Sequence, residues 1–408
     1  MNTPIQQYMV VTASYWAFTL TDGALRMLVI LYFHQLGYSP LEVASLFLLY
    51  EFCGVITNLI GGWLAARMGL NTSMHFGLAL QIIALGMLLV EPSQLSVLYV
   101  MVAQAISGIA KDLNKMSAKS SIKLLVPNDA QGKLYQWVAL LTGSKNTLKG
   151  VGFFLGAALL TSLGFRGAIA TMAACLVIVL ILSFLLLQKD LGKTKYKPKF
   201  TDIFSKSPAV NRLSAARFFL FGSRDIWFVI ALPVFLQEHL HWNHTEVGTL
   251  LAAWVIGYGF VQSAAPFITG THKGKIPDGK TAMLWAILLA IMPLAIAGFL
   301  QQGWQAGSVL IIGLLAFGAI FAVNSAVHSY LIVAYAKEDG VSLDVGFYYM
   351  ANALGRLVGT ILSGWVYQSS GLIACLIVSA VFIIITSFIS IALPRHTLKL
   401  NKDTKLNT

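Results

Sequence analysis

Residues 143–156 read GSKNTLKGVGFFLG, with Lys145 and Lys149 one helical turn apart. Residues four apart lie on the same face of an α-helix, so the two ammonium groups would point the same way. The flanking segments Tyr135–Thr142 and Val151–Leu160 are largely apolar, which places both lysines roughly 15–20 Å from the start of a membrane-spanning helix. A lysine at the centre of a bilayer costs about 2.5–3.5 kcal/mol on insertion scales. This helix therefore requires an anionic partner, supplied either by the protein or by a substrate.

The composition of the whole chain is that of a membrane protein. Of its 408 residues, 57% are hydrophobic and only 11% are charged, and the mean hydropathy is +0.75, well outside the range of soluble domains. All three cysteines fall inside apolar runs and predict neither a disulfide nor a metal site. No basic segment precedes the first apolar run and no cleavage site follows it, so we expect this run to remain in the mature protein.

Apolar runs of about 20 residues, separated by polar turns, predict twelve membrane spans. They lie near residues 8–33, 41–66, 74–91, 95–116, 135–160, 165–187, 212–236, 245–269, 281–300, 306–335, 344–368 and 371–393. Lysines gather after the sixth and eighth spans and in the C-terminal tail, whereas the connections 34–40 and 237–244 contain neither Lys nor Arg. Arg166 is an exception on that second side. By the positive-inside rule, we expect both termini to be cytoplasmic.

The lysine-rich segment 188–206 is the longest polar stretch and divides the chain into halves of similar length. We therefore expect an all-α membrane protein with an N-terminal six-helix bundle (1–187), a basic cytoplasmic linker (188–211), a C-terminal six-helix bundle (212–393) and a tail (394–408). A net charge of +12 could also indicate nucleic-acid binding. The linker lacks interleaved aromatic residues, so we interpret it as a loop that sets topology and expect no nucleic-acid partner.

The two halves of the chain resemble each other. Leu36–Leu46 reads LGYSPLEVASL and Leu240–Leu250 reads LHWNHTEVGTL. The tetrapeptide KGVG at 149–152 matches RLVG at 356–359, an alignment that places Lys145 on Asn352. Two six-helix repeats around a site at the membrane midplane are a recognised design of secondary transporters.

Cations outnumber acids among the other charged residues at membrane depth. Besides the two lysines, the cations are Arg26, Lys111, Arg217, Arg224 and Arg356, and the acids are Asp22, Glu51, Asp112 and Asp225. Asp22 and Arg26 are four residues apart, a spacing suited to an ion pair within one helix. Because internal pairing cannot neutralise every cation, the surplus predicts a water-filled cavity that receives an anion with several charged oxygens.

The residue types suggest their roles. Arginine binds phosphate-like oxyanions through two parallel hydrogen bonds, whereas lysine supplies a movable point charge. We expect the substrate to contact Arg26, Lys111, Lys145, Lys149, Arg224, Arg356, Asn146 and Asn352. We assign proton coupling or structural pairing to Asp22, Glu51, Asp112 and Asp225. Structural pairing remains an alternative for the cations, above all for Arg224 beside Asp225, and both asparagines could instead bond across helices.

Several further residues carry structural expectations. Lys115, Lys119 and Lys123 continue the Lys111 face toward the basic loops, and we interpret them as topology signals or lipid-headgroup contacts in preference to substrate ligands. Pro233 predicts a bend in the seventh span. Glycines at 150, 152 and 156 match those at 355, 359 and 364 and predict close helix approach.

With no catalytic set, metal-ligand spacing or phosphate-cradling loop in the sequence, we expect neither an enzyme nor a cofactor or metal. A non-transporting receptor remains an alternative.

Twelve spans, a basic central loop and repeated halves resemble the major facilitator superfamily. That family carries a Gly, Asp and Arg signature between spans two and three. Here Gly61–Asn71 reads GGWLAARMGLN, which keeps Gly62, Arg67 and Gly69 but has Ala66 where the family has Asp. The resemblance implies two bundles that alternate in access around a central site.

Three stretches are similar to the organoarsenical efflux permeases of the ArsJ type: Tyr15–Pro40, Ser107–Pro127 and Leu141–Gly156. This resemblance implies a multi-pass protein of the bacterial inner membrane that exports 1-arseno-3-phosphoglycerate and confers resistance to arsenate. It also implies a functional partnership with a glyceraldehyde-3-phosphate dehydrogenase, which makes the arsenoester when arsenate replaces phosphate. Arg26 and Arg224 also resemble the arginine pair of the organophosphate:phosphate antiporters, so transport of another organophosphate or organic anion remains an alternative.

Overall fold

A computed structural model describes residues 4–38, 43, 46–127, 130–187, 191–194, 198–204 and 207–395. These residues form helices and turns, with no strand among them. The α-helices are α1 (Pro4–Gln35), α3 (Leu48–Met68), α4 (Leu70–Met87), α5 (Val97–Leu125), α6 (Gln131–Leu186), α7 (Pro208–Phe228), α8 (Ala231–Glu238), α9 (His244–Ile268), α10 (Gly279–Gln301), α11 (Ala306–Tyr335) and α12 (Val341–Ile391). Short 3₁₀ helices span Pro92–Gln94, Phe200–Ile203 and Thr271–Lys273.

Helices α6 and α12 each contain a sharp bend at a glycine. Gly164 has φ 68° and Gly371 has φ 75°, a left-handed region of φ that glycine adopts without steric cost. Each bend coincides with a predicted boundary between two spans, and the two glycines follow Lys149 and Arg356 at equal distances along the chain. In the part of the chain that the structure describes, eight helices are long and apolar enough to cross a membrane, with α6 and α12 each counted once. The count of twelve spans remains a prediction.

The bend predicted at Pro233 is confirmed. Helix α7 ends at Phe228 and α8 begins at Ala231, because a proline lacks an N–H and its ring clashes with the carbonyl four residues earlier, here that of Val229. The interruption frees backbone donors. Ser363 on α12 accepts hydrogen bonds from the N–H groups of Ile230 and Ala231, at 3.4 and 3.1 Å.

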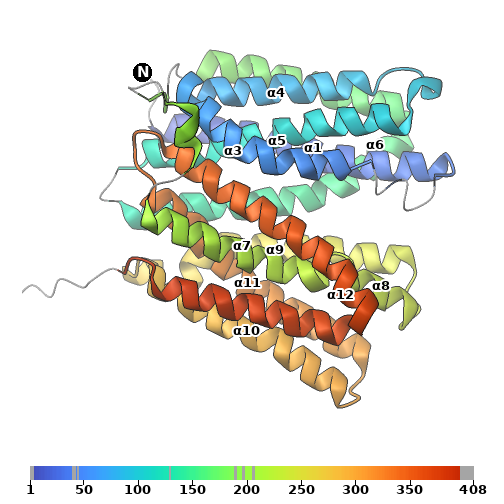
Figure 1. Cartoon of the computed structure of the whole chain (residues 1–408). Coiled ribbons are helices and arrows are strands. Elements are labelled where there is room, and N and C mark those ends of the chain that lie inside the picture. Colours follow the sequence, from blue (N-terminus) through green and yellow to red (C-terminus); the bar gives the residue numbers. More distant parts are fainter. Residues whose placement is uncertain are drawn as a thin grey trace, which may run out of the picture.

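The helices before residue 188 group together, and those after residue 207 form a second group beside them (Figure 1). In the first group α1 packs along α6, and in the second α7 packs along α12. Both pairs use aligned glycines. A Cβ atom at Gly152 would lie 2.6 Å from the carbonyl oxygen of Leu20, and one at Gly359 would lie 2.6 Å from that of Gly222. The expected close helix approach is confirmed at these positions.

We predict that Gly359→Ala lowers the thermal stability of the detergent-solubilised protein. The added methyl group would meet a backbone oxygen, and overpacking of this kind costs about 1–3 kcal/mol. Gly257→Ala on α9 is the matched control, because a Cβ atom there has nothing within 4 Å and alanine favours the helix. A melting temperature for Gly359→Ala equal to that of the control would contradict the prediction.

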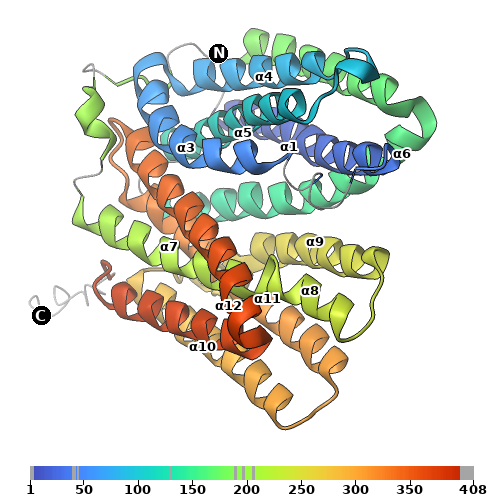
Figure 2. The same ribbon diagram turned by 45° about the vertical axis from the view of Figure 1, so that its right-hand side comes forward.

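One end of the molecule collects the basic connections. Gln7 at the start of α1 donates a hydrogen bond to the carbonyl of Leu186 at the end of α6 (2.9 Å), and Arg212 on α7 donates one to Ala392 after α12 (2.9 Å). The described ends of the chain therefore lie at the same end of the bundle (Figure 2). We call it the basic end, because the connections there include Lys193, Lys199, Lys273 and Lys275, and Lys280 lies in the first turn of α10.

The two halves meet tightly at the basic end. The hydroxyl of Ser342 on α12 donates to the carbonyl of Gly62 on α3 (2.8 Å), and Tyr330 on α11 donates to Gln131 Oε1 on α6 (3.1 Å). A Cβ atom at Gly346 would lie 3.0 Å from the Cα of Gly62. Helices α6 and α9 also pack together across the halves. The two halves are therefore packed against each other at the basic end.

Candidate anion site between the two halves

Tyr50 contacts three charged residues of the first half. Its hydroxyl donates a hydrogen bond to Asp22 Oδ1 at 2.8 Å. Its ring lies 4.8 Å from the guanidinium carbon of Arg26 and 3.8 Å from Lys111 Nζ, distances at which aromatic faces attract cations. The anticipated Asp22–Arg26 ion pair is not among the contacts of the described residues. Tyr50 was not among the predicted site residues, because one tyrosine in an apolar run carries no sequence signal.

Lys145 and Lys149 on α6 are both partly exposed, and neither has a carboxylate partner among the described side chains. The charges that act on Lys149 include Arg26 and Asp22 on α1. Lys145 interacts electrostatically with Arg356 on α12, in the other half. The structure thus brings the lysine pair near predicted cations from both halves of the chain.

Among the described acids of the first half, Asp112 pairs within its own helix and not with the lysine pair. Asp112 is buried and forms an ion pair with Lys115, one turn away on α5, with 2.6 Å between Nζ and Oδ1. This contact fits the structural-pairing role that we assigned to Asp112. The backbone of Glu51 lies in α3, but its side chain falls outside the described part of the structure.

In the second half, Asp225 lies between two arginines. Its Oδ1 accepts a hydrogen bond from Arg224 Nε at 2.6 Å, and its Oδ2 accepts one from Arg356 Nε at 3.1 Å. The Asp225 side chain is fully buried, whereas that of Arg356 is 39% exposed. One carboxylate thus links two guanidinium groups, so the three side chains together carry one net positive charge. Arg224 is therefore paired with Asp225 and Arg356 is both paired and accessible, and whether either arginine contacts substrate stays a prediction.

A chain of hydrogen bonds joins the two predicted asparagines across the halves. Asn146 on α6 donates to Gln262 Oε1 on α9 (2.6 Å), and Gln262 donates to Ser325 Oγ on α11 (3.2 Å). Arg217 on α7 donates to the same Ser325 Oγ (3.2 Å) and, through Nε, to Asn352 Oδ1 on α12 (2.8 Å). Arg217 is 3% exposed. In the sequence, Arg217 was a candidate only because it lies at membrane depth, and no feature pointed to Gln262 or Ser325 as site residues.

The structure corrects the expected lipid-headgroup contacts of two lysines on α5, whereas their role as topology signals stays a prediction. Lys119 and Lys123 are only 3% and 8% exposed, so they cannot contact lipid headgroups. Lys119 Nζ donates to the hydroxyl of Tyr349 on α12, and Lys123 Nζ donates to the carbonyl of Ala334 on α11 at 3.2 Å. The helix face that carries them is directed at the second half, which the charge pattern alone could not show.

The comparison with protein families identifies this architecture. Residues 11–230 and 213–407 match the family model of the Major Facilitator Superfamily. The chain belongs to this superfamily. As a member it is a multi-pass membrane transporter embedded in lipid, and it is not an enzyme. A comparison with curated protein sequences finds no significant match.

Solved structures of other major facilitator proteins share the fold. The human organic anion transporter MFSD10 (TETRAN) superposes with a TM-score of 0.74 at 15% identity, covering 96% of this chain and 100% of that one. A variant of the E. coli fucose:proton symporter FucP gives a TM-score of 0.72 at 12% identity, covering 94% of this chain and 98% of that one. A bacterial homologue of the iron transporter ferroportin, in an outward-facing state, gives 0.70 at 13% identity, covering 94% and 98%. At these identities, the likeness shows the fold alone.

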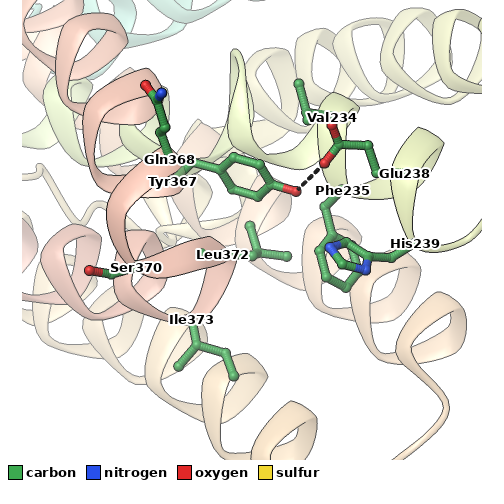
Figure 3. Close-up of a pocket in the computed structure, with 10 residues that line it drawn as sticks. Val234, Phe235, Glu238, His239, Tyr367, Gln368, Ser370, Leu372 and Ile373 are labelled. Atoms are coloured by element: carbon green, nitrogen blue, oxygen red, sulfur yellow. Dashed lines mark hydrogen bonds between the residues drawn. The ribbon is translucent and has the colours of Figure 1, made fainter.

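This major facilitator chain also has a pocket that none of the predicted anion-site residues lines. A cavity of about 550 Å³ lies between α8 and the bend of α12, where Tyr367 donates a hydrogen bond to Glu238 Oε2 at 3.3 Å (Figure 3). His239 and Leu372 also line it. None of the predicted substrate contacts lies there. Within the described ranges, no group of three or more His, Cys, Asp or Glu side chains is arranged to hold a metal ion.

Proposed function

We propose that this transporter exports a small organic oxyanion, 1-arseno-3-phosphoglycerate, and thereby confers resistance to arsenate. One observation carries the proposal. Lys145, which has no carboxylate partner among the described residues, lies in the combined field of Lys111, Lys115 and Lys119 from its own half and Arg356 from the other half. Asp112 pairs with Lys115 and Asp225 pairs with Arg356, which offsets part of this charge. A bound anion with several charged oxygens would relieve the remaining repulsion, because surplus like charges at membrane depth are costly.

The chemistry of the arsenoester suits these residues. It carries an oxyanion at each end, and the cations are likewise divided between the halves, with Lys145 and Lys149 on α6 and Arg356 on α12. Arginine would hold a phosphate or arsenate group through paired hydrogen bonds, and the lysines would add charge. The resemblance of Tyr15–Pro40, Ser107–Pro127 and Leu141–Gly156 to organoarsenical permeases supports this particular substrate.

The mechanism that we propose is alternating access. Bundles 1–187 and 212–393, joined by the linker 188–211, would rock about the central site, and the anion would screen the clustered cations so that the halves can close. With twelve spans and cytoplasmic termini, the basic end would face the cytoplasm of a bacterial cell; residues 396–408 of the expected tail lie outside the described part of the structure. The state described here would then be sealed toward the cytoplasm. A glyceraldehyde-3-phosphate dehydrogenase would supply the substrate on that side, a functional partnership that does not require it to bind the transporter.

A second candidate function is transport of another organophosphate, by exchange for phosphate or as a sugar phosphate. The observation that favours it is the pair Arg26 and Arg224, which are both partly exposed and lie on the first helix of each half. The two candidates use the same residues and differ only in what fits between them.

Transport into everted membrane vesicles tests both candidates. The arsenoester is generated outside the vesicles by glyceraldehyde-3-phosphate dehydrogenase with arsenate, and arsenic inside is measured by mass spectrometry. We expect saturable uptake that requires both the dehydrogenase and the transporter, with arsenate alone as the control. Uptake no greater than in vesicles without the transporter would refute the primary proposal. If a sugar phosphate competes and is itself taken up faster, the second candidate is supported. Repeating the assay with and without a pH gradient identifies proton coupling.

A further inference from the structure

Four lysines form a row along one face of α5. Lys111, Lys115, Lys119 and Lys123 are each four residues apart, so they share a helix face and together extend roughly 18 Å along the helix axis. Lys111 lies over the Tyr50 ring in the first half, and Lys115 pairs with Asp112. The row therefore runs from the candidate anion site toward the basic end, where the halves are in contact.

The two lysines nearest the basic end have only neutral hydrogen-bond partners. Lys119 donates to the Tyr349 hydroxyl, with its Nζ 4.7 Å from the centre of that ring. The charges that act on Lys119 are those of Arg217 and Lys115, both positive. Lys123 donates to the carbonyl of Ala334 and interacts electrostatically with Glu338, without a salt bridge between them.

An interface that only had to seal would not need these ammonium groups. Burying an ammonium group without a salt bridge is unfavourable, and apolar residues of similar volume pack such contacts at lower cost. Tyr349, Ala334 and Glu338 all belong to the second half. If the halves separate at the basic end, as the proposed alternating access requires, these partners would move away and both ammonium groups would become accessible to water. Only in that state can Lys119 and Lys123 bind a solute.

We propose that Lys119 and Lys123 form a capture site for phosphate-bearing organic anions that enter from the basic end, distinct from the central site at Lys145 and Lys149. An anion held there would pass along the lysine row to Lys111 and the central site. Closure would then return Lys119 to Tyr349 and Lys123 to Ala334. This inference rests on the proposed export of an anion from the basic end, and it adds the residues at which the anion is first bound.

Lysine labelling tests the capture site without requiring transport. Everted vesicles expose the basic end, so an amine-reactive reagent is applied there with and without 3-phosphoglycerate, and modified peptides are quantified by mass spectrometry. We expect the anion, at about ten times its dissociation constant, to slow labelling of Lys119 and Lys123 about tenfold. Lys133, exposed near the start of α6, is the matched control and should label at the same rate in both conditions.

The central-site variant Lys145→Gln/Lys149→Gln distinguishes two causes of protection: binding of the anion at Lys119 and Lys123, and closure of the halves after binding at the central site. If the anion protects only by binding centrally and closing the halves, protection will disappear in this variant, and the capture site is refuted. Protection that persists supports it. Equal labelling with and without the anion, equal protection of Lys133, or no labelling of Lys119 and Lys123 in any condition would each overturn the proposal.

A flux measurement gives an independent readout. Lys119→Gln/Lys123→Gln is expected to lower arsenoester uptake at subsaturating substrate about tenfold and to flatten its dependence on salt, because fewer charges attract the anion. Lys119→Arg/Lys123→Arg should keep the salt dependence. Glutamine and arginine variants with the same flux and salt dependence would overturn the capture role. Absence of uptake by the wild type would refute the proposed function instead, while the labelling result would still judge the capture site.

Discussion

Lys145→Gln/Lys149→Gln is expected to lower kcat/KM for arsenoester uptake into everted vesicles by about 100-fold or more. A hydrogen bond to a charged group is worth about 1.5–3 kcal/mol, and each 1.4 kcal/mol corresponds to about tenfold. Two such contacts to one anion therefore account for this loss, allowing for their coupling. The measurement is the initial rate of arsenic uptake as a function of arsenoester concentration.

Thermal stability separates this expectation from a structural role. Because no described carboxylate pairs with either lysine, replacing both removes repulsion, and the melting temperature in detergent should stay level or rise. Lys280→Gln, an exposed change at the basic end, is the control for total charge and should leave uptake unaltered. Retained uptake in the double variant would refute the central site. A lower melting temperature would instead indicate that the lysines are paired in the folded protein.

Asp225→Ala is expected to destabilise the protein by about 3 kcal/mol, the lower part of the range for breaking a buried ion pair. The fully buried carboxylate holds both Arg224 and Arg356, and its removal leaves two guanidinium groups facing each other. The partial exposure of Arg356 moderates the cost, because water can solvate that group. We expect a fall in melting temperature, together with loss of arsenoester uptake.

A second substitution, at Arg356, tests whether repulsion between the two arginines causes this instability. In Asp225→Ala/Arg356→Gln one of the two repelling cations is gone, so the double variant should be more stable than Asp225→Ala alone. Asp225→Asn keeps the side-chain shape and removes the charge, and should lie between the wild type and Asp225→Ala. A melting temperature of Asp225→Ala equal to that of the wild type would show that the carboxylate does not hold the arginines together.

The sequence by itself determined the class of protein and much of its local structure. Long apolar runs demand helices in a membrane, because lipid offers no hydrogen-bond partners to the backbone. The bend before Pro233 and the close packing at Gly152 and Gly359 follow from properties of single residues: a missing N–H in proline and a missing side chain in glycine. The match of KGVG with RLVG indicated the repeat, and the structure places the two segments on the corresponding helices α6 and α12.

Only the tertiary structure decided which charges meet. Asp112 pairs with Lys115 and not with the lysines of α6, and Asp225 bridges Arg224 and Arg356. These choices depend on how helices distant in sequence are rotated against one another. In a membrane, lipid-facing and buried surfaces are both apolar, so hydropathy along the chain does not tell which face of a helix meets its partner. For that reason the sequence led us to interpret the α5 lysines as headgroup contacts. In the structure, Lys119 and Lys123 face the second half instead.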